Sequence, residues 1–231
     1  MLLEDILGKA IAERRHPTLY EALRFIEAYG LSVARYRLAR SADEAVEAAE
    51  ELGYPVVLKV SSPDVIHKTE VGGVVVGLKG PKDVRRAYDS IVSALKGRVP
   101  GARLEGIVVQ EMVEGGYEVI VGGLDDPQFG PVVAVGLGGV YVEVFKDVVF
   151  ELAPISPREA LRSIKMLKAA RILEGYRGKP PADLYALAEF VSKVSQLIWD
   201  YRGRIKELDL NPTFAMAKGV VAADARVILR F

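Results

Sequence analysis

A change of pattern near residue 100 constrains the possible folds of this chain more than any other feature of its sequence. Before it, helical segments that open with a capping box and stop at glycine alternate with apolar strands. Thr18 with Glu21, and Ser41 with Glu44, have the capping-box spacing. Beyond the basic stretch KGRVPGARLEG (96–106), the chain is instead rich in short apolar strands.

The strand-rich half indicates the fold class. Its expected strands are IVVQEMV (107–113), YEVIVGGL (117–124), PVVAVGL (131–137), VYVEVF (140–145) and DVVFELAPI (147–155). Two capped helices and two further strands complete the chain. The order predicts an α+β fold of two lobes, residues 18–110 and 111–231, after a helical lead-in at residues 1–17.

Composition excludes several classes of function. The 231 residues are half apolar, with 31 basic and 31 acidic side chains, so a bulk electrostatic grip on nucleic acid or an anionic membrane is not expected. There is no cysteine, and no apolar run approaches the ~20 residues that span a bilayer. The first ten residues are acidic where a signal peptide is basic. We therefore expect a cytoplasmic protein without nucleic-acid or membrane partners.

The stretch VLKVSSPDVIHKTEVGG (57–73) contains the first candidates for chemistry. Lys59 lies in an apolar run, His67 follows eight residues later, and Gly72 and Gly73 come next. Glycine amides and a lysine can hold phosphate, and a neutral imidazole can accept a phosphoryl group. Alternatively, the lysine ends a strand in solvent, the glycines make a tight turn and the histidine is a surface residue. Neither a P-loop nor a Rossmann motif occurs.

The C-terminal strands contain oxygen donors. Asp209 and Asn211 are two residues apart in ELDLNP, as are Asp224 and Arg226 in AADAR. Residues two apart on a strand share a face, so paired strands could gather these oxygens for Mg²⁺. Polar strand faces exposed to water would show the same spacing.

The segment QEMVEGGYEVIVGG (110–123) joins the two expected lobes. Glu111 ends one apolar strand and Glu118 lies inside the next. This segment could hydrogen-bond an adenine through its backbone and a ribose through a carboxylate. The alternative is ordinary alternation of side chains toward solvent.

Together these pieces resemble an ATP-grasp domain. They are most similar to the small subunit of the archaeal ADP-forming (NDP-forming) acetyl-CoA synthetases, which are relatives of succinyl-CoA synthetase. The similar segments are GYPVVLKVSSPDVIHKTEVGGV, EVIVGGLDDPQFGPVVAVGLGGVYVEVFKDV, APIS, GYRGKPPAD, ELDLNP and DAR. They are spread over most of residues 18–229. The runs HK-[ST]-x-x-GG and GLGGxxVE are the most specific, whereas DxNP occurs in many ATP-grasp proteins.

The resemblance implies a nucleotide held between the two lobes and a role for each candidate. Lys59 would contact the ATP phosphates under a loop containing Gly72 and Gly73, and His67 would be phosphorylated. The remaining implied contacts are Glu111, Met112 and Val113 with adenine, Glu118 with ribose, and Asn211 and Asp224 with Mg²⁺, with Asp209 beside them.

The resemblance also implies a divided enzyme. The family reaction converts acyl-CoA, ADP and phosphate into the free acid, ATP and CoA. This chain has no recognisable CoA-binding domain, so we expect a larger partner subunit with its own phosphorylated histidine, in an α2β2 heterotetramer. A self-contained carboxylate–amine ligase and a non-catalytic nucleotide-binding scaffold are the alternatives. The residues of the glycine-rich loop Gly136–Gly139 suggest no role by themselves.

Overall fold

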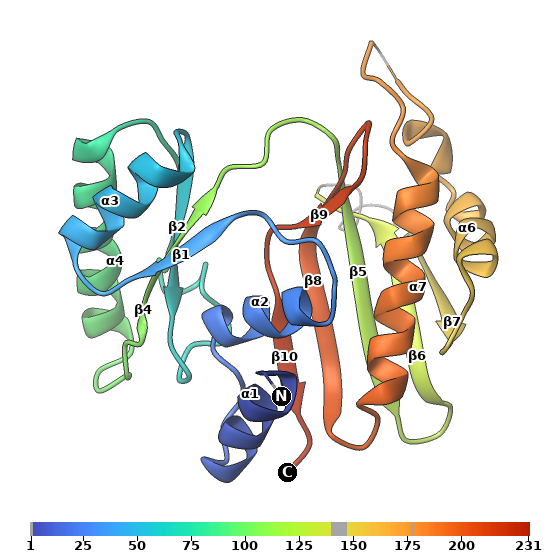
Figure 1. Ribbon diagram of the computed structural model, residues 1–231, viewed down its shortest axis with the longest axis horizontal. Helices are drawn as coiled ribbons and strands as arrows, with labels where there is room; N and C mark the ends of the chain where they lie inside the picture. Colours follow the sequence, from blue (N-terminus) through green and yellow to red (C-terminus); the bar gives the residue numbers. More distant parts are fainter. Residues whose placement is uncertain (1, 140–146, 177) are drawn as a thin grey trace. The chain divides into compact units, whose positions relative to one another are not determined.

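The computed structural model describes residues 2–139, 147–176 and 178–231 (Figure 1). Contacts divide the chain into two compact units. The small unit comprises Pro17–Ala22 and Ala34–Val113; the large unit comprises Met1–His16, Leu23–Val33 and Glu114–Phe231. Each contains an antiparallel sheet with helices, so the predicted α+β class is confirmed.

The observed division differs from the predicted lobes at the N-terminal side. Helix α1 (Leu2–Ala12) belongs to the large unit, and the division runs through α2 (Leu19–Ala28). The second half of α2 joins the large unit because Phe25 packs edge-to-face on Tyr201, with ring centroids 5.2 Å apart. Such a long-range contact leaves no trace in local sequence pattern.

The small unit is a sheet backed by two helices. Its strands are ordered β1 (Tyr36–Ala39), β4 (Gly106–Glu111), β2 (Val56–Ser61) and β3 (Val74–Leu78), all antiparallel. Helices α3 (Ala42–Leu52) and α4 (Pro81–Arg98) pack on one face. Alternate strand residues such as Leu58 and Val109 enter this core, so their neighbours Lys59 and Gln110 lie on the opposite face.

The large unit is built around a longer sheet. Its described strands follow the order β10 (Arg226–Leu229), β8 (Ile205–Ala215), β5 (Tyr117–Asp126), β6 (Gly130–Leu137) and β7 (Val148–Leu152), and β9 (Val220–Ala222) also pairs with β8. The helices α6 (Pro157–Met166) and α7 (Leu184–Asp200) lie together on one side of this sheet (Figure 1). A 3₁₀ turn, Ala170–Ile172, lies between them in sequence. α7 packs on β5 and β6, where a Cβ on Gly123 would stand 3.0 Å from Ile198.

The local signals were accurate where capping chemistry fixed an element. Thr18 and Glu21 form both bonds of a capping box at the start of α2, and Ser156 caps α6 in the same way. The predicted strand at residues 140–145 lies outside the described residues. In the part of the chain that is described, no helix is long and apolar enough to cross a membrane.

Candidate functional site

Strand β2 places Lys59 in a buried position. The residue is 6% exposed, and its Nζ donates to Oε1 of Gln110 at 2.9 Å. Gln110 is held in turn by the bond from its Nε2 to the Ala34 carbonyl, at 3.2 Å. Burying a lysine is costly unless its charge is compensated. The solvent-facing interpretation of Lys59 is therefore wrong, and contact of Lys59 with phosphate stays a prediction.

His67 lies on an exposed loop between β2 and β3. Residues 62–73 form bends and turns without regular structure, and the His67 side chain is 63% exposed. Its Nδ1 stands 4.0 Å from a carboxylate oxygen of Glu70. An imidazole this exposed is accessible to a phosphoryl donor, as a covalent carrier must be.

The glycine pair is required by the turn that closes this loop. Gly72 has φ +70°, and a Cβ on Gly73 would collide with Val60 Cγ1 and stand 2.9 Å from the Lys68 carbonyl. The two amides already donate inside the turn, Gly72 to the Thr69 carbonyl at 3.0 Å and Gly73 to the Lys68 carbonyl at 2.7 Å. In this conformation the pair shapes the loop, and contact of Gly72 and Gly73 with phosphate stays a prediction.

The predicted adenine segment is anchored to the small unit through several of its polar groups. Glu111 accepts from the backbone N of Arg35 at 2.8 Å and from its Nε at 2.6 Å, and Met112 N donates to the Pro55 carbonyl at 3.1 Å. These bonds fix the path of the chain as far as Val113, where the small unit ends. Hydrogen bonds from Glu111–Val113 to a nucleotide stay a prediction.

Two predicted residues of the large unit, Glu118 and Asp209, lie on one face of its sheet. On β5, residues 119, 121 and 123 are buried toward α7, so Glu118 points to the other face. Asp209 pairs with Gly122 and therefore shares that face. Asn211 lies where the register of β8 with β5 shifts, between Leu210 and Thr213, and Asp224 lies in the break between β9 and β10.

The register of β8 with β9 and β10, continued through the unpaired residues 223–225, would place Asp224 opposite Asn211. Thr213 pairs with Ala222 and Asp209 with Arg226, so the same register holds on both sides of the break at residues 223–225. The Ala223 amide donates to the Pro212 carbonyl at 2.9 Å, as that register requires. Side chains opposite each other in an antiparallel pair are ~5 Å apart at Cβ, close enough to share one cation.

Asp209 forms an ion pair with a neighbouring arginine. Its Oδ2 lies 3.5 Å from Nη2 of Arg226, which also pairs with Glu207. Among the described residues no group of three or more histidine, cysteine or acidic side chains is gathered for a metal. A magnesium site here would therefore consist of Asn211 and Asp224, hard oxygen donors that fit the ion, with Asp209 beside them.

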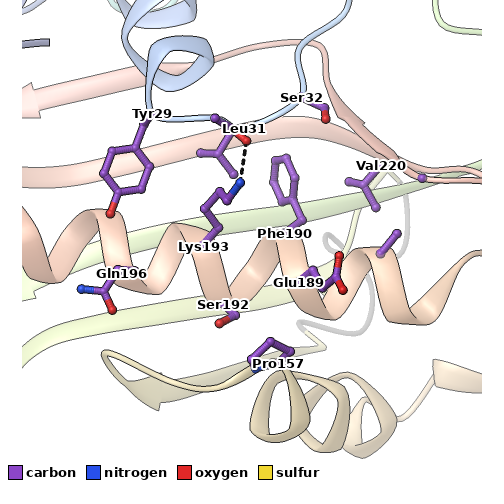
Figure 2. Close-up of a pocket in the computed structure, with 13 residues that line it drawn as sticks. Tyr29, Leu31, Ser32, Pro157, Glu189, Phe190, Ser192, Lys193, Gln196 and Val220 are labelled. Atoms are coloured by element: carbon purple, nitrogen blue, oxygen red, sulfur yellow. Dashed lines mark hydrogen bonds between the residues drawn. The ribbon is translucent and has the colours of Figure 1, made fainter.

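A groove elsewhere on the large unit contains none of the predicted residues. It has a volume of about 780 Å³, and α7 contributes Phe190 and Lys193 to it (Figure 2). Lys193 Nζ donates to the Gly30 carbonyl at 2.9 Å across its edge. Tyr29, also in the wall, donates to Asp200 at 2.6 Å, and burial together with this bond raises the pKa of its hydroxyl. The groove is separate from the candidate site.

Two features of the site were missed by sequence reasoning. Gln110 is a polar residue in an apolar strand, the same signal that singled out Lys59, and could have been found. The acidic and basic residues that hold the His67 loop, Asp64 and Arg103, are 39 positions apart and have no sequence signature.

Comparison with known proteins identifies the family. The model of an ATP-grasp domain matches residues 9–229. The beta subunit of acetate–CoA ligase (ADP-forming) I from Pyrococcus furiosus is 43% identical over 225 residues, 97% of each chain. Acetate–CoA ligase (ADP-forming) I from Archaeoglobus fulgidus is 48% identical over 98% of this chain, which spans only 33% of that longer protein.

Solved structures agree. The dinucleotide-forming acetyl-coenzyme A synthetase 1 of Ca. Korarchaeum cryptofilum, in complex with coenzyme A and Ca-AMPCP, superposes with a TM-score of 0.93 at 46% identity, over 98% of this chain and 99% of that one. The same protein with coenzyme A and Mg-AMPPCP, its phosphohistidine segment pointing towards the nucleotide binding site, gives 0.84 at 42% identity, over 99% and 100%. The chain therefore belongs to the ATP-grasp domain family, among the beta subunits of ADP-forming acetate–CoA ligases.

Proposed function

We propose that this chain is the nucleotide-binding subunit of an ADP-forming acyl-CoA synthetase, in which it moves a phosphoryl group between a phosphohistidine and ADP. The observation that carries the proposal is the presence, within one unit, of an exposed loop histidine and a buried strand lysine. The match over nearly the whole Pyrococcus beta subunit supports it. The net reaction is acyl-CoA plus ADP and phosphate giving acid, ATP and CoA.

The transfer through His67 balances in two steps. A neutral ring nitrogen of His67 attacks the phosphorus of the partner's phosphohistidine; one P–N bond forms on His67 as the other breaks, and the partner's imidazole leaves neutral. A β-phosphate oxygen of ADP then attacks the phosphorus on His67, forming the new P–O bond of ATP and releasing the His67 imidazole. Both steps run equally in reverse.

The nucleotide takes contacts from residues of both units. We assign Lys59 to the phosphates, Glu111, Met112 and Val113 to adenine and Glu118 to ribose. Asn211 and Asp224 would hold Mg²⁺, which supplies charge neutralisation and orientation of the phosphates when bound. One Korarchaeum complex contains Mg-AMPPCP, which supports this choice.

A larger CoA-binding subunit completes the enzyme. The Archaeoglobus relative is about three times as long as the region it shares with this chain, whereas the Pyrococcus relative is a separate beta subunit of matching length. We propose that the missing part acts here as an α subunit with its own phosphohistidine, in an α2β2 assembly. The acyl group would be chosen by that partner.

Dependence on the partner is the first test. We expect the purified chain to bind ADP or ATP with Mg²⁺ by calorimetry, and to form no acetyl-CoA from acetate, ATP and CoA until the CoA-binding subunit is added. Acetyl-CoA made by the chain alone would contradict the proposal that a separate subunit binds CoA. ATP turnover with an added amine would favour the carboxylate–amine ligase, and nucleotide binding without phosphoryl transfer in the full complex would favour the scaffold.

Lys59→Met separates the charge of Lys59 from its packing. The methionine fills most of the buried space but loses the ammonium, so ADP affinity should fall by about tenfold or more, the worth of one charge-assisted hydrogen bond. The melting temperature without ligand should hold or rise, because a charge that is costly to bury is removed. Titration calorimetry and a thermal melt measure the two effects.

Lys79→Met is the matched control, since Lys79 is exposed just beyond the end of β3 in the same unit. It should leave ADP affinity unchanged. If Lys59→Met binds ADP as tightly as this control, Lys59 is a structural residue and leaves the proposed site.

A further inference from the structure

We infer that Asp64 and Arg103 are positioning residues for the histidine loop, residues 62–73: their ion pair is a latch that confines His67 to a small volume. The inference rests on the proposed role of His67 as phosphoryl carrier, and it names the residues that control how that carrier moves. The latch joins the loop to the segment between α4 and β4, called here the strap, residues 98–105.

The latch consists of three hydrogen bonds to one carboxylate. Oδ2 of Asp64 accepts from the backbone N of Arg103 at 2.8 Å and from its Nε at 3.1 Å, and Oδ1 accepts from Nη2 at 2.9 Å. The two-pronged contact between guanidinium and carboxylate fixes direction as well as distance. Asp64 is therefore held to the strap in one orientation.

The strap holds the other side of the loop as well. Nη1 of Arg98 donates to the Glu70 carbonyl at 2.6 Å. Asp64 and Glu70 are each three residues from His67, so the histidine is midway between two anchors on the same strap. These two contacts are the inner anchors.

Outer anchors lie at the roots of the loop, six residues from His67 on each side. Ser61 donates from Oγ to Glu105 at 2.8 Å, and its carbonyl accepts from the Glu105 amide at 3.0 Å. Gly73 accepts from Val60 N at 2.8 Å and has no room for a side chain. Ser61 is fully buried and Gly73 is buried, so these roots do not open easily.

The inner anchors are of a different kind, because they are exposed. The side chain of Arg103 is 62% exposed and that of Asp64 33%. Exposed ion pairs are weak and are screened by salt. The loop can therefore leave its inner anchors while its roots stay fixed, which is the behaviour of a latch rather than of a core contact.

Chain geometry gives the consequence for His67. An extended chain covers about 3.5 Å per residue, so His67 can move roughly 10 Å from each inner anchor and about 20 Å from each root. Breaking the latch therefore frees His67 on its Asp64 side, while the contact of Arg98 with Glu70 and the bond from the Gly73 amide to the Lys68 carbonyl still limit it on the other side, so the accessible volume grows. A phosphoryl acceptor spread through a larger volume spends less time in line with its donor.

The first experiment measures the loop directly, without any activity. The chain has no cysteine, so spin labels at His67→Cys and Ser93→Cys, on an exposed turn of α4, report one distance distribution in the full chain. Arg103→Ala removes the two guanidinium bonds and keeps the backbone bond from residue 103 to Asp64, so we expect it to widen that distribution measurably and Arg103→Lys to widen it less. The matched control is Arg86→Ala, which breaks the exposed Arg86–Asp83 pair of α4, 2.6 Å long, and touches no loop residue.

The second experiment uses the complex with the CoA-binding subunit. In otherwise wild-type chains, Arg103→Ala should lower kcat for ATP formation several-fold and leave the KM for ADP within twofold, because Arg103 positions His67 and does not hold the nucleotide. Arg103→Lys should recover part of the rate. Arg86→Ala should match the wild type.

The two readouts separate the latch from the carrier role. An unchanged distance distribution in Arg103→Ala overturns the latch, whatever His67 does. A wider distribution with unchanged or increased kcat overturns the positioning role. If His67→Ala itself retains full activity, the proposed function fails, while the distance measurement still decides whether the strap holds the loop.

Discussion

His67→Ala should abolish ATP formation in the assembled enzyme while leaving nucleotide binding and subunit assembly intact. Removing the nucleophile closes the covalent route, so we expect a loss of at least about a thousandfold. Folding should be little affected, since the side chain is 63% exposed and its nearest carboxylate is 4.0 Å away. With radioactive phosphate and acyl-CoA, label should accumulate on the histidine of the CoA-binding subunit and fail to reach ADP.

The chain's other histidine provides the control. His16 accepts a hydrogen bond from the Leu229 amide at Nδ1, 3.1 Å, and stacks on Phe231, and burial lowers the pKa of its imidazole. His16→Gln keeps an acceptor there and should pass label to ADP normally. If label reaches ADP at the wild-type rate in His67→Ala, the relay through His67 is wrong and the residue is a phosphate contact or a loop residue.

The parts of the site that sequence predicted are those with a local physical signature. Lys59 stood out because a charge inside an apolar strand is costly, and it is indeed buried. Asp209 and Asn211 stood out by their spacing of two on one strand, and both lie on β8, although the register of β8 with β5 shifts at Asn211 and their shared face stays a prediction. Capping boxes set the starts of α2 and α6 in the same local way.

Other parts depend on pairings between distant segments, which no local pattern encodes. Gln110 meets Lys59 only because β4 pairs with β2 in one register, with Lys59 opposite Val108. The latch from Asp64 to Arg103 joins a loop to a strap that the sequence presented only as a break in pattern. Likewise, the division of α2 between the units follows from the contact of Phe25 with Tyr201.

The proposed metal site depends partly on local spacing and partly on pairings between distant segments. Its residues were predicted from spacing, and the register of β8 with β9 and β10, continued through residues 223–225, would place Asp224 opposite Asn211. The predicted continuous strand over residues 219–229 is interrupted at residues 223–225, and Asp224 lies in that interruption. A break in a strand frees a side chain from the regular pleat, so it can turn toward a ligand.

Asp224→Ala should therefore reduce phosphoryl transfer far more than it reduces stability, and Asp224→Asn sharpens the test. Oδ1 of Asp224 accepts from the Ala225 amide at 2.9 Å, a bond that asparagine can keep while it loses the charge. We expect the rate in the full complex to fall about a hundredfold, because neutralising phosphate charge is worth several kcal/mol in such reactions. The Mg²⁺ concentration for half-maximal rate should rise, and Mn²⁺ binding with ADP, followed by electron paramagnetic resonance, should weaken in parallel.

Asp209→Asn is the matched control for Asp224→Asn, because it removes a second carboxylate charge near the proposed metal site. Asp209 is also predicted to lie beside the metal, but Arg226, 3.5 Å away, already offsets its charge. Removing the charge of Asp209 should therefore weaken metal binding less than removing the charge of Asp224. An Asp224→Asn enzyme that matches the wild type at ordinary Mg²⁺ removes Asp224 from the metal site. If Asp209→Asn instead shows the larger loss in rate and in Mn²⁺ binding, the ion sits further along β8, and Arg226 is then a neighbour of the phosphates rather than a partner that keeps Asp209 from the metal.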